Sequence, residues 1–319
     1  MLFYIGKRLL QGALTVLGVT IVVFMLQNMI ASGPELARVL IGGRATPGQV
    51  HAFVKEYALN QPAVTQYGQY LWHLLHGNLG YSFKLSDSVA HLIGQTLPKD
   101  AVLVVAGIVL ALILAIPTGL YQAARRNTAI DFSGTGIAFV LYSMPWFLMG
   151  LLFIAAFAVY LPWLPAQAPQ GTSLGAILSK PSGLVLPVLT LALGDYAIFS
   201  RFMRSSAVDT LTQDFIRTAR AKGLGEWRIL TRHVLRNSLI PVVTVVGLNI
   251  PQLLSALLVV EWVFNYPGMG VLFFNAATQS DYPVELGVLL VVSIATVVGS
   301  LLADLAYAVL DPRVSYRTA

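Results

Sequence analysis

The sequence contains no cysteine and very little charge. Without cysteine, disulfides, thiolate metal sites and cysteine nucleophiles are excluded. Only 11% of the 319 residues are charged, against about 25% in an ordinary soluble domain. Hydrophobic residues make up 56% of the chain, which is more than one soluble core of this length needs. The composition therefore predicts an integral membrane protein and excludes a soluble enzyme, a disordered chain and a disulfide-stapled secreted module.

Six segments are apolar enough and long enough to cross a bilayer, which takes roughly 20 residues. The first follows Lys7 and Arg8 like a signal peptide, but its apolar run is longer than the ~7–15 residues typical of one. We therefore expect it to be a retained span. Prolines interrupt several spans, which indicates either ordinary kinks or bends that open a cavity. The predicted spans cover residues 9–31, 101–121, 135–160, 184–203, 239–260 and 286–310.

The basic residues orient these spans. If the N-terminus is cytoplasmic, 14 of the 20 Lys and Arg residues fall inside, whereas six fall outside, mostly in one long loop. Positive residues favour the cytoplasmic side, so we expect both termini there. The same bias accounts for the net charge of +6 without nucleic acid. The 14 are Lys7, Arg8, Arg125, Arg126, Arg201, Arg204, Arg217, Arg220, Lys222, Arg228, Arg232, Arg236, Arg313 and Arg317; the six are Arg38, Arg44, Lys55, Lys84, Lys99 and Lys180.

The outside loop, residues 32–100, is patterned as a small helical cap. Thr46-Pro47-Gly48-Gln49 fits a capping box with proline at the first helical position. Apolar residues then recur at helical spacing in two stretches, and Gly77 is placed to end the second helix. Ser86 is expected to cap a third helix. The two apolar faces are Val50, Phe53, Val54 and Tyr57, and Val64, Tyr67, Leu71, Leu74 and Leu75; the third helix carries Val89, Leu92 and Ile93.

Histidines of this loop leave a metal site conceivable, because His73 and His76 lie at i, i+3. No acidic residue accompanies them, so we favour solvated surface histidines. Tyr67, Tyr70 and Trp72 suit the membrane interface.

The inside loop, residues 205–238, carries two short helical patterns. Asp209 is expected to cap the first, which Gly223 and Gly225 end, and the second starts near Glu226. Arg228, Arg232 and Arg236 then recur every four residues. This basic stripe could rest on anionic headgroups. The glycine break instead favours a helix-turn-helix offered to a cytoplasmic partner.

Residues 214–224, DFIRTARAKGL, resemble the EAA coupling loop of bacterial ABC importer permeases. They match the form typical of the dipeptide/oligopeptide/nickel branch, with Arg217 in place of the EAA glutamate and Leu235-Arg236 in place of leucine-proline. Other segments similar to this branch are residues 59–62, 77–82, 261–270 and 281–283, with Asp304, Tyr307 and Asp311-Pro312-Arg313. The chain departs from the branch at Gly33-Pro34-Glu35 and Gly299-Ser300.

This resemblance implies an all-α, six-helix, type I importer permease that forms half of a translocation pore. It implies a first span with its extracytoplasmic loop in residues 1–95, a transporter domain in 96–310 and a cytoplasmic tail in 311–319. The implied partners are a second permease, two cytoplasmic ATP-binding subunits, an extracytoplasmic binding protein and membrane lipid. No cofactor is implied, and no G-x-x-x-x-G-K-[ST] phosphate loop occurs, so ATP hydrolysis is expected on the partners. The residues expected to couple to the ATPases are Asp214, Arg217, Thr218, Ala219, Lys222, Gly223 and Leu224.

Asp195 lies midway along the fourth predicted span. A carboxylate is costly in lipid, so we expect it to face protein or water. It could pair with Arg201 or a partner's residue, line the substrate pathway, or be protonated. Asn249, Gln252 and Ser255, spaced by three in the fifth span, are the companions expected in that pathway.

Two other functional classes remain as alternatives. A secondary transporter usually shows repeated halves and several intramembrane ionisable residues, and an intramembrane enzyme shows paired acids or an HExxH helix. The sequence shows none of these clearly. Peptides are the expected cargo, with nickel chelates, glutathione or another small solute as the alternative, because selectivity in such systems resides largely in the binding protein.

Overall fold

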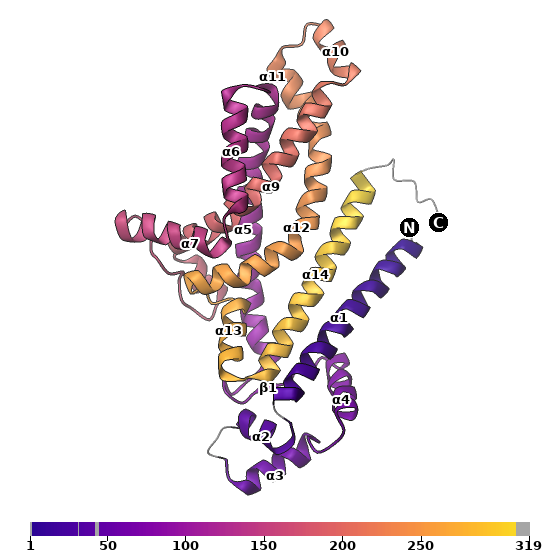
Figure 1. Ribbon diagram of the computed structural model, residues 1–319, viewed down its shortest axis with the longest axis vertical. Helices are drawn as coiled ribbons and strands as arrows, with labels where there is room; N and C mark the ends of the chain where they lie inside the picture. Colours follow the sequence, from indigo (N-terminus) through magenta and orange to yellow (C-terminus); the bar gives the residue numbers. More distant parts are fainter. Residues whose placement is uncertain (1, 31, 42–44, 311–319) are drawn as a thin grey trace. The chain divides into compact units, whose positions relative to one another are not determined.

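The computed structural model describes residues 2–30, 32–41 and 45–310 of the chain (Figure 1). The predicted tail 311–319, with Arg313 and Arg317, and the loop residue Arg44 lie outside these residues. The described part is all-α apart from one small antiparallel hairpin, which pairs Tyr81 with Ser88. It divides into two compact units. Unit 1 contains Met1–Asp100, Gly171–Leu174 and Pro267–Val297, and unit 2 contains Ala101–Gln170, Gly175–Tyr266 and Val298–Ala319.

Helices and the hairpin of unit 1 come mainly from the N-terminal third of the chain. They are α1 (Leu2–Ile30), α2 (Gly33–Ile41), α3 (Pro47–Glu56), α4 (Ala63–Leu75), β1 (Tyr81–Ser82), β2 (Asp87–Ser88) and α13 (Met269–Gln279). Two long helices contribute residues to both units, α5 (Val89–Ala124) and α14 (Tyr282–Leu310).

Unit 2 is formed by the middle of the chain. Its helices are α6 (Ala129–Ser143), α7 (Trp146–Ile154), α8 (Leu174–Leu178), α9 (Val185–Leu211), α10 (Asp214–Ala221), α11 (Glu226–Ile229) and α12 (Leu235–Phe264). Three short segments of other helix types adjoin these α-helices. Two are π-helical, η1 (Ala155–Tyr160) and η3 (Leu230–Val234), and one is a 3₁₀-helix, η2 (Pro181–Leu184). The helix η3 joins α11 to α12 without a break in the helical path.

Among the described residues, five helices are long and apolar enough to cross a membrane, or six if the bent pair α6–α7 forms one span. These helices coincide with the six spans predicted from hydropathy. The chain is therefore a multi-pass membrane protein. The five unbroken candidates are Gly6–Leu26, Val89–Ala124, Pro181–Leu211, Glu226–Phe264 and Tyr282–Leu301.

The third predicted span is not one straight helix, which corrects the expectation for residues 135–160. The chain breaks between α6 and α7, and the two helices meet at 103°. Met144 adopts an extended conformation with ψ 124°, and Pro145 follows it as the residue before α7. Proline disfavours a helical conformation at the residue that precedes it, which explains the break.

The first cap helix forms as the sequence predicts. Thr46 and Gln49 make the reciprocal capping box, in which the Thr46 amide donates to the Gln49 side chain at 2.8 Å. Val50 and Phe53 of α3 are buried and pack in one cluster with Ala37 of α2. Tyr57 of the expected apolar face follows the end of the helix and stacks on Phe53.

The third cap helix is an incorrect prediction. Ser86 has φ +53° and no capping role; Ser88 instead accepts a hydrogen bond from the His91 amide at 3.3 Å. The helix that starts at Val89 then runs on to Ala124 as α5, so it is the beginning of a membrane helix. Its predicted inward residues Val89 and Ile93 are buried, in a cluster with residues of α13 and α14.

The second cap helix, α4, buries less of its apolar face than expected. Val64 and Leu75 are more than four-fifths exposed, whereas Tyr67 and Tyr70 contact the ring of Phe24 in α1. Gly77, with φ +78°, follows the helix end as predicted.

Helices α9 and α12 form the centre of unit 2 and run side by side (Figure 1). Leu191 of α9 packs with Leu257, Val260 and Phe264 of α12 in one buried cluster. Helix α7 approaches α9 closely at Gly194, where a Cβ would lie 2.3 Å from the Trp146 ring. Only glycine leaves room for the indole there.

Candidate functional site

The short helix α10 carries most of the residues that resemble the coupling loop. It begins at Asp214 after Gln213, whose side chain makes no capping hydrogen bond. Asp209, predicted as the cap, lies inside α9, which continues to Leu211. The prediction of Asp209 as a helix cap was wrong because α9 continues beyond the predicted span, which ended at residue 203, into the loop.

Helix α10 has one buried and one exposed side. Ile216 and Ala219 are buried against Met203 and Ala207 of α9 and Val234 of η3. Leu224 is half-buried and packs against the same cluster. The other predicted coupling residues are exposed, namely Asp214, Arg217, Thr218, Lys222 and Gly223.

A Schellman turn ends α10. The Leu224 amide donates to the Ala219 carbonyl at 3.2 Å, and the Gly223 amide donates to Arg220 at 2.9 Å. Gly223 has φ +78°, which L-residues with a side chain rarely adopt, and no atom lies within 4 Å of a Cβ built there. Glycine is therefore required by the backbone of this turn and not by crowding.

An ion pair that sequence reasoning missed spans the same turn. Arg220 donates to both carboxylate oxygens of Glu226, at 2.7 and 3.2 Å. The pair holds α10 to α11 on either side of Gly223. The sequence did offer a signal for this pair, because Arg220 and Glu226 carry opposite charges on either side of Gly223. Both side chains are about half-exposed, so the pair sets geometry more than stability.

The base of the loop is fixed to the membrane helices by buried polar contacts. The Ser238 hydroxyl donates to Thr210 at 3.1 Å and joins α12 to the end of α9. Asp131 of α6 is buried and accepts two hydrogen bonds from Arg204 of α9 and one from the Asn127 amide. Neither contact was predicted, because both join residues distant in sequence. Arg228, Arg232 and Arg236 of the predicted basic stripe are exposed.

Asp195 is fully buried within α9, as expected of an intramembrane carboxylate. The Asn249 side chain of α12 donates to one of its oxygens at 2.6 Å. The other oxygen has no hydrogen-bond partner in the described part of the chain. Arg201, the alternative partner, lies elsewhere, exposed and above the ring of Tyr142.

The three predicted companions of Asp195 do not stay together. Asn249 is buried beside Asp195, whereas Gln252 and Ser255 are exposed on α12. Spacings of three advance a helix by 300° each, so the direction drifts by about 60° per step. That drift carries the later two residues out of the interior.

The histidines of the cap make local contacts. The His76 ring contacts the Trp72 carbonyl at 2.8 Å, and His91 pairs with Asp87 at 2.7 Å. The hydrogen bond from His91 lowers the pKa of Asp87. No group of three potential ligands gathers for a metal within residues 2–30, 32–41 and 45–310.

Two family models match nearly the whole chain. Residues 107–316 match the binding-protein-dependent transport system inner membrane component, and residues 1–104 match the N-terminal membrane component of the same systems. The chain is similar to the oligopeptide transport system permease protein AppB of Bacillus subtilis, with 36% identity over 98% of this chain and 99% of the relative. The dipeptide transport system permease protein DppB of the same organism is 37% identical over 98% and 97%. The oligopeptide transport system permease protein OppB of Escherichia coli K12 is 34% identical over 99% and 100%.

Proposed function

Since this chain belongs to the family of binding-protein-dependent transport system inner membrane components, we propose that it forms half of the pore of an ATP-driven peptide importer. As a permease subunit of this family it has no catalytic role of its own. Three relatives that align over almost their full length, two oligopeptide permeases and one dipeptide permease, support the peptide cargo.

The proposed partners are a second permease subunit, two cytoplasmic ATP-binding subunits and an extracytoplasmic binding protein. The observation that best supports the ATPase contact is the form of α10. It presents Arg217, Thr218 and Lys222 on one side, while Ile216 fixes its other side to α9. A partner that binds one arrangement of α10 better than another can shift the two states of the pore.

Within the predicted coupling set we divide the roles by burial. The exposed residues Asp214, Arg217, Thr218 and Lys222 form the proposed contact surface. Ala219 and Leu224 anchor the helix, because their side chains pack on the chain's own core. Gly223 sets the turn and leaves the surface beside it free of a side chain.

For the substrate pathway we propose two different roles. Asp195 and Asn249 form a buried polar link between α9 and α12, the two helices that flank the coupling loop. Gln252 and Ser255 lie on the exposed surface of α12 and are the residues proposed to face cargo.

Gly223→Arg tests the coupling role, with Gly223→Asn as its matched control. Asparagine tolerates the left-handed conformation, whereas arginine adds both backbone strain and a long cation beside the contact surface. In proteoliposomes that contain the complete transporter, we expect Gly223→Arg to abolish peptide uptake and cargo-stimulated ATP hydrolysis. Gly223→Asn should retain most of both. Cargo-stimulated hydrolysis at the wild-type rate in an assembled Gly223→Arg complex would contradict the proposal.

The proposed orientation places both termini in the cytoplasm of a bacterial inner membrane and the cap outside. Because the chain has no cysteine, single-cysteine variants need no background removal. Gln69→Cys on α4 should react with an impermeant maleimide in intact spheroplasts. The exposed Trp227→Cys on α11 should react only after lysis. The reverse pattern would overturn the orientation.

A further inference from the structure

Helix α4 carries an apolar stripe that the rest of the described chain leaves uncovered. Val64 and Leu75 are more than four-fifths exposed, and Trp72 is 63% exposed. At about 100° per residue, these three side chains fall within about 80° of one another around the helix. The half-buried Leu71 lies beside them. We call these four residues the α4 stripe.

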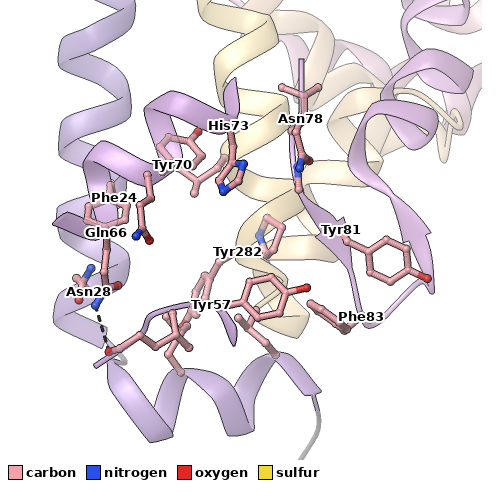
Figure 2. A pocket seen from close by; sticks show the side chains of 18 of the residues that line it. Phe24, Asn28, Tyr57, Gln66, Tyr70, His73, Asn78, Tyr81, Phe83 and Tyr282 are labelled. Carbon is pink, nitrogen blue, oxygen red and sulfur yellow. Dashed lines mark hydrogen bonds between the residues drawn. The ribbon is translucent and has the colours of Figure 1, made fainter. Parts of the chain in front are cut away.

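The reverse side of α4 is polar. Gln66, Gln69 and His73 fall within about 60° of one another, away from the stripe. They line a half-open cavity of about 440 Å³ in unit 1, together with side chains from α1, the other cap helices and α14 (Figure 2). Helix α4 contains no Asp, Glu, Lys or Arg. A wide apolar stripe with a polar reverse side is the form of a helix that lies in a membrane interface.

Contacts with α1 set the depth of α4. The hydroxyls of Thr20 and Tyr67 share a hydrogen bond of 2.9 Å. The Phe24 ring contacts those of Tyr67 and Tyr70, with centroids 5.3 and 6.2 Å apart. Thr20 lies inside the candidate span Gly6–Leu26, six residues or about 9 Å before its end. Helix α4 therefore lies beside a membrane-spanning helix at the depth of its apolar residues, and not above it.

The surroundings of α1 at this depth are apolar. Val22, Met25 and Leu26 flank the contact with α4 along the chain, and each is more than half exposed. Exposed apolar side chains are favourable on a spanning helix because hydrocarbon, and not water, is their solvent. The α4 stripe, at the same depth, is exposed to the same solvent.

We propose that the α4 stripe docks into the leaflet on the cap side of the membrane, where lipid acyl chains cover it. With 13 residues, α4 is about 20 Å long, which is too short to cross the ~30 Å hydrocarbon core. It is therefore a second attachment of the cap to the bilayer, in addition to α1. Interfacial helices usually add Lys and Arg that attract anionic headgroups. Because α4 has none, its attachment depends on apolar burial and not on lipid charge.

A protein partner fits the stripe less well than lipid does. A soluble partner would have to reach the stripe through the headgroups, beside a helix that exposes apolar side chains. Another membrane subunit can reach that depth, so the test compares the permease alone with the complete transporter.

Fluorescence quenching tests the docking. Because the chain has no cysteine, Val64→Cys and Leu75→Cys each take a single NBD label, and Gln69→Cys on the polar side is the matched control. Each protein is placed in phosphatidylcholine nanodiscs with or without nitroxide-labelled acyl chains. We expect the nitroxide to reduce the two stripe signals about twofold or more, because such a helix inserts by about 5–10 Å. The Gln69 label should lose less than half as much and be quenched more strongly by aqueous iodide.

Two results would overturn the docking. Stripe labels that iodide quenches as strongly as the Gln69 label, with no effect of the nitroxide lipid, would show that the stripe faces water. Nitroxide quenching in the permease alone that disappears in the complete transporter would show that another subunit covers the stripe.

Lipid charge and a pair of variants complete the test. Replacement of a third of the phosphatidylcholine by phosphatidylglycerol should leave the quenching unchanged, and a marked increase would contradict attachment by apolar burial alone. Leu75→Asp places a carboxylate in the stripe and should reduce the lipid quenching of a Val64 label about twofold or more. His73→Asp adds the same charge on the polar side and should not change it. If Leu75→Asp fails to assemble, the comparison of the stripe labels with Gln69 still decides.

The quenching reports where α4 lies whether or not the transporter imports peptide. A failure of the docking and a failure of the proposed function are therefore distinguishable.

Discussion

The buried Asp131–Arg204 pair should respond unequally to the loss of its two members. The Asp131 side chain is 2% exposed, whereas that of Arg204 is 29% exposed. Asp131 also accepts a hydrogen bond from the Asn127 amide at 2.9 Å. Removal of the arginine leaves a buried carboxylate, and removal of the carboxylate leaves a cation that can reach water.

The expected magnitudes follow from that difference. Arg204→Met should destabilise the permease by about 2–4 kcal/mol, somewhat less than the usual cost of an unpaired buried charge because Arg126 still attracts the carboxylate. Asp131→Asn should cost about 1–2 kcal/mol, because the amide oxygen can still accept from Asn127 and only charge-assisted hydrogen bonds are lost. The double variant removes the stranded charge, so it should be more stable than Arg204→Met alone by about 2 kcal/mol.

Thermal unfolding of the detergent-purified permease, followed by intrinsic fluorescence, measures this order. Arg201→Met is the matched control, since Arg201 is exposed on the same helix and lies over the face of the Tyr142 ring, for which a loss under ~1 kcal/mol is expected. Equal losses for Arg204→Met and Asp131→Asn, or a double variant less stable than both, would refute the reasoning. The first result would mean that the carboxylate is effectively solvated.

Two further changes probe the packing of the membrane helices. Asp195→Asn keeps the shape and the hydrogen bond from Asn249 but removes the charge, so we expect slower transport with assembly intact; Ser200→Ala, which removes a buried hydroxyl that has no partner in the described residues, should transport normally. Wild-type rates in Asp195→Asn proteoliposomes would remove its functional role, and failed assembly would show a structural one. Gly119→Ala places a Cβ 2.7 Å from the Ser200 carbonyl oxygen and should lower stability by about 1–3 kcal/mol, whereas Gly136→Ala meets no atom within 4 Å and should be neutral or stabilising by up to about 1 kcal/mol. Equal unfolding temperatures for the two alanine variants would contradict the close approach of α5 and α9.

Local signals predicted those features that depend on neighbouring residues. The Thr46–Gln49 capping box and the turn at Gly223 could be predicted because each is determined by residues within a stretch of six. Asp209 and Ser86 are residue types that often precede helices, yet at both positions a long membrane helix determines where the helix boundary falls. Pro145 was visible, but no rule of sequence distinguishes a kink from a break of 103°.

Long-range features could not be predicted from the sequence. The interior position of Asp195 could be predicted, because a carboxylate is costly in lipid. Its hydrogen bond with Asn249 could not, because that contact depends on the relative rotation of α9 and α12. The same holds for Asp131 with Arg204, which are 73 positions apart. The cavity in unit 1 combines side chains from both ends of the chain, so no window of sequence contains it.

The unbroken helical path from Glu226 to Phe264 has a mechanical consequence. A uniform rod would carry a displacement of the α10–α11 turn undiminished to its far end. This one contains Pro241 and Pro251, each of which omits one backbone hydrogen bond. Bending of this path is therefore expected at the two prolines and at the π-helical segment η3. Part of any displacement of the turn at Arg220–Glu226 would thus become a change in the bend angle of the helix. The positions of the two prolines and of η3 determine where along the helix that change occurs.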